Sequence, residues 1–137
     1  MDWKTLFFSA RGRIARRDFW IGFVFVMIAS GALNLIPGNA GKVIGLLVLW
    51  PQVCIHAKRL HDMGRTAWLM LIPFLITVAC TFVAAMTGVA GATDAAAMLG
   101  LGLIVLAAVV GLSFLLWVGL TKGTPGPNRF GEAPVPL

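Results

Sequence analysis

The sequence predicts an all-α polytopic membrane protein, with four transmembrane helices in an antiparallel bundle and both termini in the cytoplasm. Three observations carry this prediction: the composition, a succession of long apolar runs, and basic residues confined to one side of those runs. Of the 137 residues, 59% are hydrophobic and only 12% are charged, whereas soluble domains carry about 25% charged residues. So few charges cannot cover a surface that faces water, and lipid is the expected solvent.

The first two apolar runs predict a pair of antiparallel spans. Residues 19–36 form a run of 18 residues, and a helix of that length measures about 27 Å, close to the hydrocarbon thickness. The Pro/Gly-rich turn at 37–41 is too short to hold a domain, so the run 43–57 must return through the membrane. That second run is short for a span, and we expect its helix to continue into the polar stretch and to end near Gly64, a left-handed C-cap. Pro51 predicts a kink in it.

The second half of the chain predicts two longer spans, residues 67–92 and 95–120. Small residues recur in the third run at four-residue intervals, a pattern that lets helices approach closely in lipid: Cys80, Ala84, Gly88 and Ala92. Residues 121–137 form a polar tail rich in Pro and Gly. The whole chain, residues 1–137, is therefore expected to be one four-span membrane domain.

The leader, residues 1–18, allows two interpretations. Trp3, Leu6 and Phe7 fall at helical spacing beside Lys4, which favours a short helix in the membrane interface. A poorly ordered terminal segment is the alternative, because chain ends often fray unless other contacts hold them.

The basic residues predict the orientation. Five Lys or Arg residues lie in the leader, three at 58–65 and two in the tail, so that ten of the eleven fall on one side and only Lys42 falls on the other. Cytoplasmic segments of membrane proteins carry such an excess. We therefore expect a multi-pass membrane protein with its N-terminus and C-terminus in the cytoplasm.

The net charge of +6 would favour nucleic acid as the partner of a soluble protein. Here the basic segments lie beside apolar runs, so topology explains the charge and no nucleic-acid partner is expected. Trp20, Trp68 and Trp117 each lie near a predicted span end and are expected to act as interface anchors.

Three polar clusters lie on the predicted cytoplasmic side: residues 11–20, 59–65 and 123–131. In the first, basic and aromatic side chains at spacings of three, four and seven are expected to share one helical face: Arg13, Arg16, Arg17 and Trp20.

In these clusters the chain resembles the small bacterial inner-membrane proteins catalogued as domain of unknown function 805. The matching segments are Gly12-Arg13-Ile14-Ala15-Arg16-Arg17-Asp18-Phe19-Trp20, Lys58-Arg59-Leu60-His61-Asp62-Met63-Gly64-Arg65-Thr66-Ala67-Trp68 and Gly126-Pro127-Asn128-Arg129-Phe130-Gly131. The middle segment is the most specific of the three. The resemblance implies a multi-span inner-membrane protein and implies no activity.

The clusters predict a site for an anionic lipid headgroup, because guanidinium groups bind phosphate in bidentate fashion and juxtamembrane basic residues attract anionic lipid. Asp62 is expected to orient Arg59 or Arg65. The candidate ligand-binding residues are Arg13, Arg16, Arg17, Arg59, His61, Asp62, Arg65, Asn128 and Arg129. The alternative for the arginines is topology alone, with their side chains reaching to the interface.

Several functions remain open at this stage. A binding or structural protein is favoured, with a membrane-protein partner or a second copy as further possible partners. A small transporter or channel subunit is the alternative. A lipid-phosphate enzyme with His61 as base and Asp62 as its orienter is disfavoured, because adjacent helix residues point about 100° apart. Two His and two Cys are too few for a zinc site of characteristic spacing, so neither a metal nor a cofactor is expected.

Overall fold

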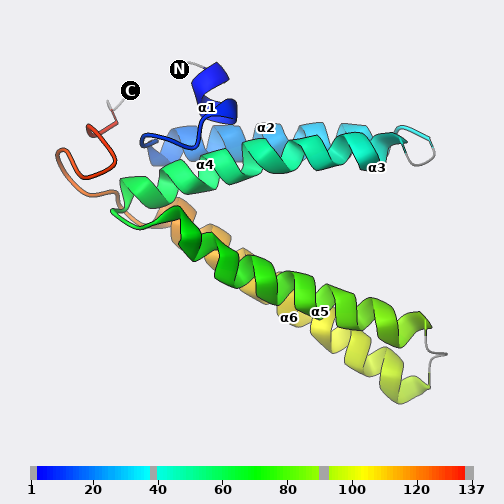
Figure 1. Cartoon of the computed structure of the whole chain (residues 1–137). Coiled ribbons are helices and arrows are strands. Elements are labelled where there is room, and N and C mark those ends of the chain that lie inside the picture. The colour runs from blue at the N-terminus through cyan, green and yellow to red at the C-terminus, as the bar shows by residue number, and fades with distance from the viewer. Residues whose placement is uncertain (1–2, 38–39, 90–92, 135–137) are drawn as a thin grey trace. The chain divides into compact units, whose positions relative to one another are not determined.

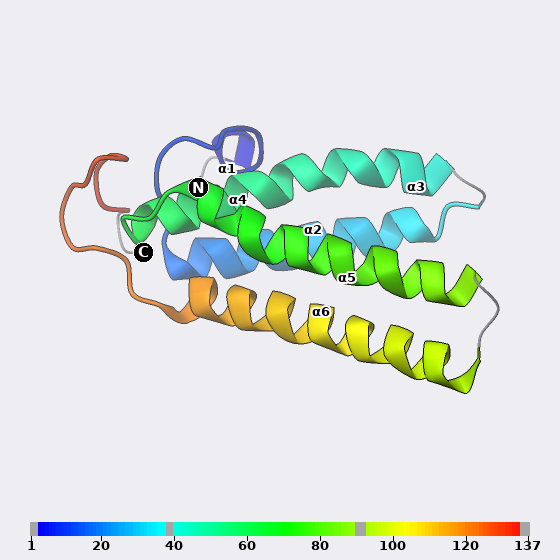
Figure 2. The same cartoon turned by 60° about the horizontal axis from the view of Figure 1, so that its bottom comes forward.

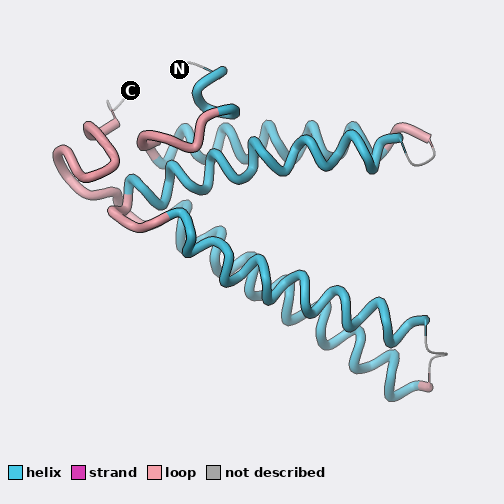
Figure 3. Tube along the Cα trace, viewed as in Figure 1, coloured by secondary structure: helices cyan, strands magenta, loops and turns pink. Residues whose placement is uncertain are grey.

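A computed structural model describes residues 3–37, 40–89 and 93–134. The regular structure of these residues is helical, apart from one isolated bridge between Asn128 and Gly131 (Figures 1 and 3). The helices are α1 (Trp3–Phe8), α2 (Arg16–Asn34), α3 (Ala40–Gly45), η1 (Leu46–Val48), α4 (Leu49–Asp62), η2 (Ala67–Met70), α5 (Leu71–Val89) and α6 (Asp94–Leu120). The all-α prediction is confirmed for the described residues.

The chain forms two compact units. Unit 1 comprises Met1–Ala67 and Val118–Leu137, and unit 2 comprises Trp68–Trp117. The last turn of α6 thus belongs to unit 1, together with the C-terminal segment. The expectation of a single domain stays a prediction.

In unit 1, α2 and α4 run antiparallel and side by side, and α1 packs against α4 (Figures 1 and 2). The leader therefore contains a helix. Leu6 and Phe7 of α1 are buried and meet the other helices at Gly22, where an added Cβ would lie 3.3 Å from Ile55 Cγ2 and 3.5 Å from Leu6 Cδ2. The buried ammonium of Lys58 donates hydrogen bonds to backbone carbonyls of α1, which fixes α1 to α4.

Helix α4 ends as its sequence predicts. Gly64 adopts a left-handed φ of +71°, the Arg65 N–H donates to the Leu60 carbonyl at 2.8 Å, and the Gly64 N–H donates to the His61 carbonyl at 3.0 Å. This pair of bonds is a Schellman motif. At the other end of α4, Pro51 lacks the N–H that an α-helix would donate to the residue four positions earlier, and the chain forms the 3₁₀ turn η1 just before α4.

In unit 2, α5 and α6 run antiparallel and approach closely at Gly100. A Cβ added at Gly100 would lie 2.9 Å from Thr87 Oγ1 and 3.6 Å from the Ala84 carbonyl oxygen, so a larger residue there would require Thr87 to move. Ala84 belongs to the predicted ladder of small residues, whereas Gly88 has open space around it. Ala92, the last member of that ladder, lies outside the described residues.

Three stretches of the described chain are long and apolar enough to cross a membrane: Val43–Asp62, Ala67–Gly88 and Asp94–Leu120. Helix α2, which contains most of the first predicted span, is not among them. It has 19 residues, of which the first three, Arg16, Arg17 and Asp18, are charged, so 16 remain. The chain is a helical membrane protein, and the fourth span and the four-helix bundle stay predictions.

Candidate functional site

The first polar cluster does not form one helical face, and that prediction is wrong for Arg13. Helix α2 begins only at Arg16, after an extended N-cap residue Ala15 with φ −68° and ψ 161°. Before it, Gly12 has a left-handed φ of +92°, a conformation that glycine adopts without strain. Arg13 therefore lies in a loop, and its side chain is free to reach across to α4.

The centre of the site is a buried group of three side chains, Arg13, Asp62 and Arg59, which we call the Arg–Asp–Arg cluster. Arg13 Nε and Nη2 both lie 3.0 Å from Asp62 Oδ1, and Arg59 Nη1 donates to Asp62 Oδ2. The side chains of Arg13, Arg59 and Asp62 are 1%, 0% and 5% exposed. One carboxylate thus compensates two guanidinium groups, and the cluster keeps one net positive charge. Asp62 is paired with Arg59, which was one of the two partners expected from the sequence, and also with Arg13, which was not expected.

Arg59 also binds backbone carbonyls from two other parts of the chain. Its Nε donates to the Val118 carbonyl at 3.1 Å, its Nη1 to the Ile14 carbonyl at 3.3 Å, and its Nη2 to the Thr121 carbonyl. Val118 lies in the last turn of α6, where helix carbonyls lack intrahelical partners. Arg59 therefore joins the end of α6 to the loop before α2.

Arg13 holds the C-terminal segment, which we define as residues 121–134. Its Nη2 donates to the Thr124 carbonyl at 2.6 Å, and its Nη1 donates to the Gly126 carbonyl at 2.7 Å and the Gly131 carbonyl at 3.3 Å. With the hydrogen bond from Nε to Asp62, four of the five N–H donors of this guanidinium are used.

The C-terminal segment also caps the end of α4. The N–H and the hydroxyl of Thr124 donate to the Asp62 carbonyl at 2.8 and 3.1 Å. Asn128 Nδ2 donates to the His61 carbonyl at 3.0 Å and to Thr124 Oγ1 at 2.9 Å. These bonds satisfy carbonyls that the helix end leaves without partners.

His61 contacts both the C-terminal segment and the loop before α2. Its ring stacks on Phe130 with centroids 4.0 Å apart and planes inclined by 8°, and its Nδ1 lies 3.2 Å from the Gly12 carbonyl oxygen. The Arg129 guanidinium lies over the Phe130 ring, with its Cζ 4.7 Å from the ring centre. The Asp62 carboxylate accepts from two arginines, and the ion pairs of the described residues do not include His61.

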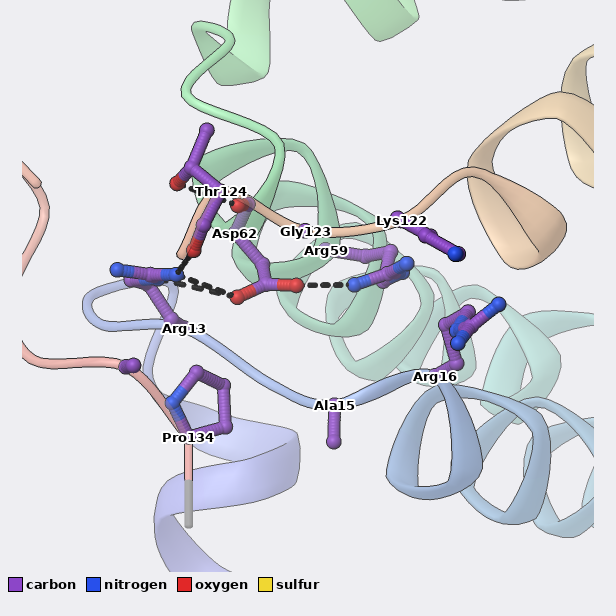
Figure 4. A pocket seen from close by; sticks show the side chains of 10 residues that line it. Arg13, Ala15, Arg16, Arg59, Asp62, Lys122, Gly123, Thr124 and Pro134 are labelled. Carbon is purple, nitrogen blue, oxygen red and sulfur yellow. Dashed lines mark hydrogen bonds and ion pairs between the residues drawn. The ribbon is translucent and has the colours of Figure 1, made fainter. Parts of the chain in front are cut away.

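A pocket of about 370 Å³ opens beside the Arg–Asp–Arg cluster (Figure 4). It is lined by Arg13, Ala15, Arg16, Arg59, Asp62, Lys122, Gly123, Thr124, Ala133 and Pro134. Arg16 and Lys122 are exposed, and Figure 4 shows their cationic ends on the same side of the pocket as the Arg59 guanidinium. The pocket therefore has a floor of buried ion pairs and a rim of exposed cations.

Gly123 lets the C-terminal segment pass directly over the cluster. A Cβ added at Gly123 would lie 2.0 Å from Asp62 Oδ2, which is closer than atoms can approach. The third polar cluster therefore needs glycine at this position.

The other predicted site residues lie away from the pocket. Among the described residues, those that line it do not include Arg17 or Arg65, both of which are exposed. His61, Asn128 and Arg129 belong to the contacts that hold the C-terminal segment. Lys122 was not predicted as a site residue, because its charge was attributed to topology alone; its position directly before the third cluster was the available signal.

The predicted tryptophan anchors differ in their surroundings. Trp68 is 77% exposed and Trp117 is 39% exposed, as an interface anchor requires. Trp20 instead packs on Gly119, where an added Cβ would lie 2.4 Å from the indole Cζ2. Trp20 thus contacts protein, and its contact depends on glycine in the last turn of α6.

Apolar helices joined by a buried Arg–Asp–Arg cluster define a helical membrane protein whose polar residues are concentrated at the helix ends. The chain belongs to the family described as "Protein of unknown function (DUF805)", which matches residues 7–132.

Two relatives from Escherichia coli (strain K12) support this assignment. The "Inner membrane protein YhaH" is 26% identical over 152 aligned positions, which cover 98% of this chain and 97% of that protein. The "Uncharacterized protein YiiR" is 35% identical over 78 residues, so that the match spans 50% of this chain and about half, 53%, of that protein. No solved structure matches the chain. The resemblance seen in the three polar clusters is therefore confirmed, and no activity comes with it.

Proposed function

We propose that this protein is a four-span protein of the inner membrane, with both termini in the cytoplasm, whose pocket binds the anionic headgroup of a membrane lipid. The observation that carries the proposal is the charge of the pocket. Among the described residues, its lining contains four cationic side chains, Arg13, Arg16, Arg59 and Lys122, and one acidic side chain, Asp62. The excess is four minus one, or three positive charges.

The position of the pocket suits a headgroup. It lies where α2 begins and just after α6 ends, since Ala15 precedes α2 and Lys122 follows Leu120. If both helices cross the bilayer, these ends lie at headgroup depth. The distribution of ten of the eleven basic residues puts that side in the cytoplasm, and the name of the relative YhaH supports the inner membrane.

Within this proposal the two kinds of cation have separate roles. Arg13 and Arg59 hold the structure together, because most of their N–H donors bind Asp62 and backbone carbonyls, and Arg59 keeps one donor for the headgroup. To the described residues, Arg16 makes one hydrogen bond, from Nη1 to the Leu120 carbonyl at 3.4 Å, and it is exposed like Lys122. These two exposed side chains bind the headgroup.

Native mass spectrometry tests the proposal. The full-length protein is released from membranes that contain phosphatidate, phosphatidylglycerol and cardiolipin in a phosphatidylcholine background, and retained lipid is counted. We expect Arg16→Gln with Lys122→Gln to lose retained anionic lipid. The control, Arg17→Gln with Arg65→Gln, also removes two positive charges, but from residues outside the pocket, and is expected to retain lipid like the wild type. Equal retention in both double variants would refute the pocket as the site.

A further inference from the structure

We propose that the group bound in this pocket is a phosphomonoester, held at the N-terminus of α2 by Arg16, Lys122 and Arg59. This inference rests on the proposed function and sharpens it, because it selects one class of headgroup among the anionic lipids. A phosphomonoester carries about −1.5 to −2 charges at pH 7, whereas the phosphodiester that links an ordinary phospholipid headgroup carries one.

The excess of three positive charges in the pocket favours a dianion over a monoanion. Arg13, Arg59 and Asp62 form a group in which one carboxylate already compensates one guanidinium. Arg16 and Lys122 add two further positive charges at the rim. A monoanionic diester would leave at least one of these two charges without compensation.

The backbone of α2 adds donors at the same place. The N-cap residue Ala15 lines the pocket, and no side chain caps this 19-residue helix. The first N–H groups of a helix lack intrahelical acceptors and attract anions, and the helix dipole adds to that attraction. Asp18 lies in the first turn, outside the lining residues of the described chain.

Arg59 supplies the third and independent feature. Its side chain is fully buried, and the hydrogen bonds that the structure gives it use four of its five N–H donors. Within the described part of the chain, the remaining donor is on Nη2, in a side chain that lines the pocket. A phosphate oxygen at the pocket floor would complete the set of hydrogen bonds of this guanidinium.

A phosphomonoester can come from two sources, a lipid such as phosphatidate or free phosphate. The experiment has one arm for each. In the first arm, the full-length protein in phosphatidylcholine nanodiscs is titrated with phosphatidate and, separately, with phosphatidylglycerol. In the second arm, inorganic phosphate is titrated by calorimetry into the same nanodiscs without anionic lipid.

We expect phosphatidate to bind about fivefold or more tightly than phosphatidylglycerol, because one more charge is compensated. Arg16→Gln with Lys122→Gln should weaken phosphatidate binding by roughly 30-fold, since two cations are lost, whereas Arg17→Gln with Arg65→Gln should not remove the preference. A second result would also support the inference. If the two lipids bind equally, but inorganic phosphate binds and Arg16→Gln with Lys122→Gln abolishes that binding, the pocket takes a phosphomonoester whose source is free phosphate.

Two outcomes overturn the inference and separate it from the proposed function. If both lipids bind equally at the pocket and inorganic phosphate does not bind, the phosphomonoester is wrong and the anionic headgroup stands. If neither lipid nor phosphate binds, or if both double variants bind like the wild type, both proposals fail.

Discussion

Asp62 is the residue on which the candidate site depends. Its two carboxylate oxygens accept from two buried guanidinium groups, and its backbone carbonyl accepts from Thr124. A buried ion pair contributes modestly as a whole, but removing one partner leaves an uncompensated buried charge. The loss of this one carboxylate therefore affects α4, the loop before α2 and the C-terminal segment at once.

Asp62→Asn tests this dependence. The amide has the size of the carboxylate but leaves both guanidiniums without their counterion, and we expect a loss of about 3–5 kcal/mol in the free energy of unfolding. Thermal unfolding in detergent measures it. Glu132→Gln, an equivalent change at an exposed position of the C-terminal segment, should leave the melting temperature within the error of the wild type. An unchanged melting temperature for Asp62→Asn would contradict the central place of the cluster.

Gly123→Ala tests the close passage of the C-terminal segment over Asp62. The added Cβ would lie 2.0 Å from Asp62 Oδ2, so either the segment or the carboxylate must move, and we expect destabilisation by about 1–3 kcal/mol. Gly102→Ala is the matched control, because its Cβ would meet open space and a helical alanine is favoured over glycine by about 0.5–1 kcal/mol. We expect the melting temperature to fall for Gly123→Ala and to rise for Gly102→Ala. Equal shifts for the two variants would argue against the close packing at Gly123.

At the residue scale, the sequence offered Arg59 as one of two partners for Asp62 and missed the distant partner Arg13. Arg59 lies three positions before Asp62, on the same helix face. Arg13 lies 49 positions away, and its place depends on where α2 begins. Helical spacing placed Arg13 on α2, whereas Gly12 and the extended Ala15 put it in a loop. Spacing alone does not resolve such a difference of one turn.

Among the elements, the C-terminal segment is held mainly by polar contacts. Arg13, Thr124 and Asn128 connect it to α4 and to the leader loop, and the stack of His61 on Phe130 adds an apolar contact. The segment has no helix of its own within the described residues. Its order therefore depends on a small number of side-chain hydrogen bonds.

Asn128→Ala tests how the segment is held. The change removes the donor to the His61 carbonyl and to Thr124 Oγ1, and the acceptor of the Phe130 N–H. Because each hydrogen bond contributes about 1 kcal/mol, we expect trypsin to cleave after Lys122 roughly tenfold faster or more. Limited proteolysis with mass spectrometry follows the cleavage. Glu132→Ala, on the same segment, should cleave at the wild-type rate; equal rates for both variants would refute the role of Asn128.

The helix ends show which elements can be predicted from sequence. Gly64 identified the end of α4, because a left-handed glycine after a helix has a specific hydrogen-bonding role. The helix in the leader was one of two open interpretations, since α1 has only six residues and its stability depends on the buried Lys58 and on contacts with α4. The close approach at Gly100 needed the structure, because a small residue permits contact without requiring it.

At the scale of the whole molecule, the ion pairs and the pocket lie at helix ends, and apolar side chains dominate the helices. Large apolar side chains of α5 and α6 are exposed, among them Phe82 at 62% and Leu101 at 63%, as expected for helices that face lipid. The polar residues that the sequence distributes over three segments meet in one cluster and one pocket. The composition predicted that the helices have exposed apolar surfaces. It could not predict that the three polar segments come together, because that depends on long-range contacts that composition does not encode.

The central claim is that these three segments lie together on the cytoplasmic side of a four-span protein. Cysteine labelling with a membrane-impermeant maleimide tests it most directly, in a background without Cys54 and Cys80, at three single positions: Ala40→Cys in the predicted outer turn, Arg65→Cys after α4 and Glu132→Cys in the C-terminal segment. We predict that Ala40→Cys is labelled in intact spheroplasts, and that Arg65→Cys and Glu132→Cys are labelled only after permeabilisation. Labelling of either Arg65→Cys or Glu132→Cys in intact spheroplasts would contradict the claim.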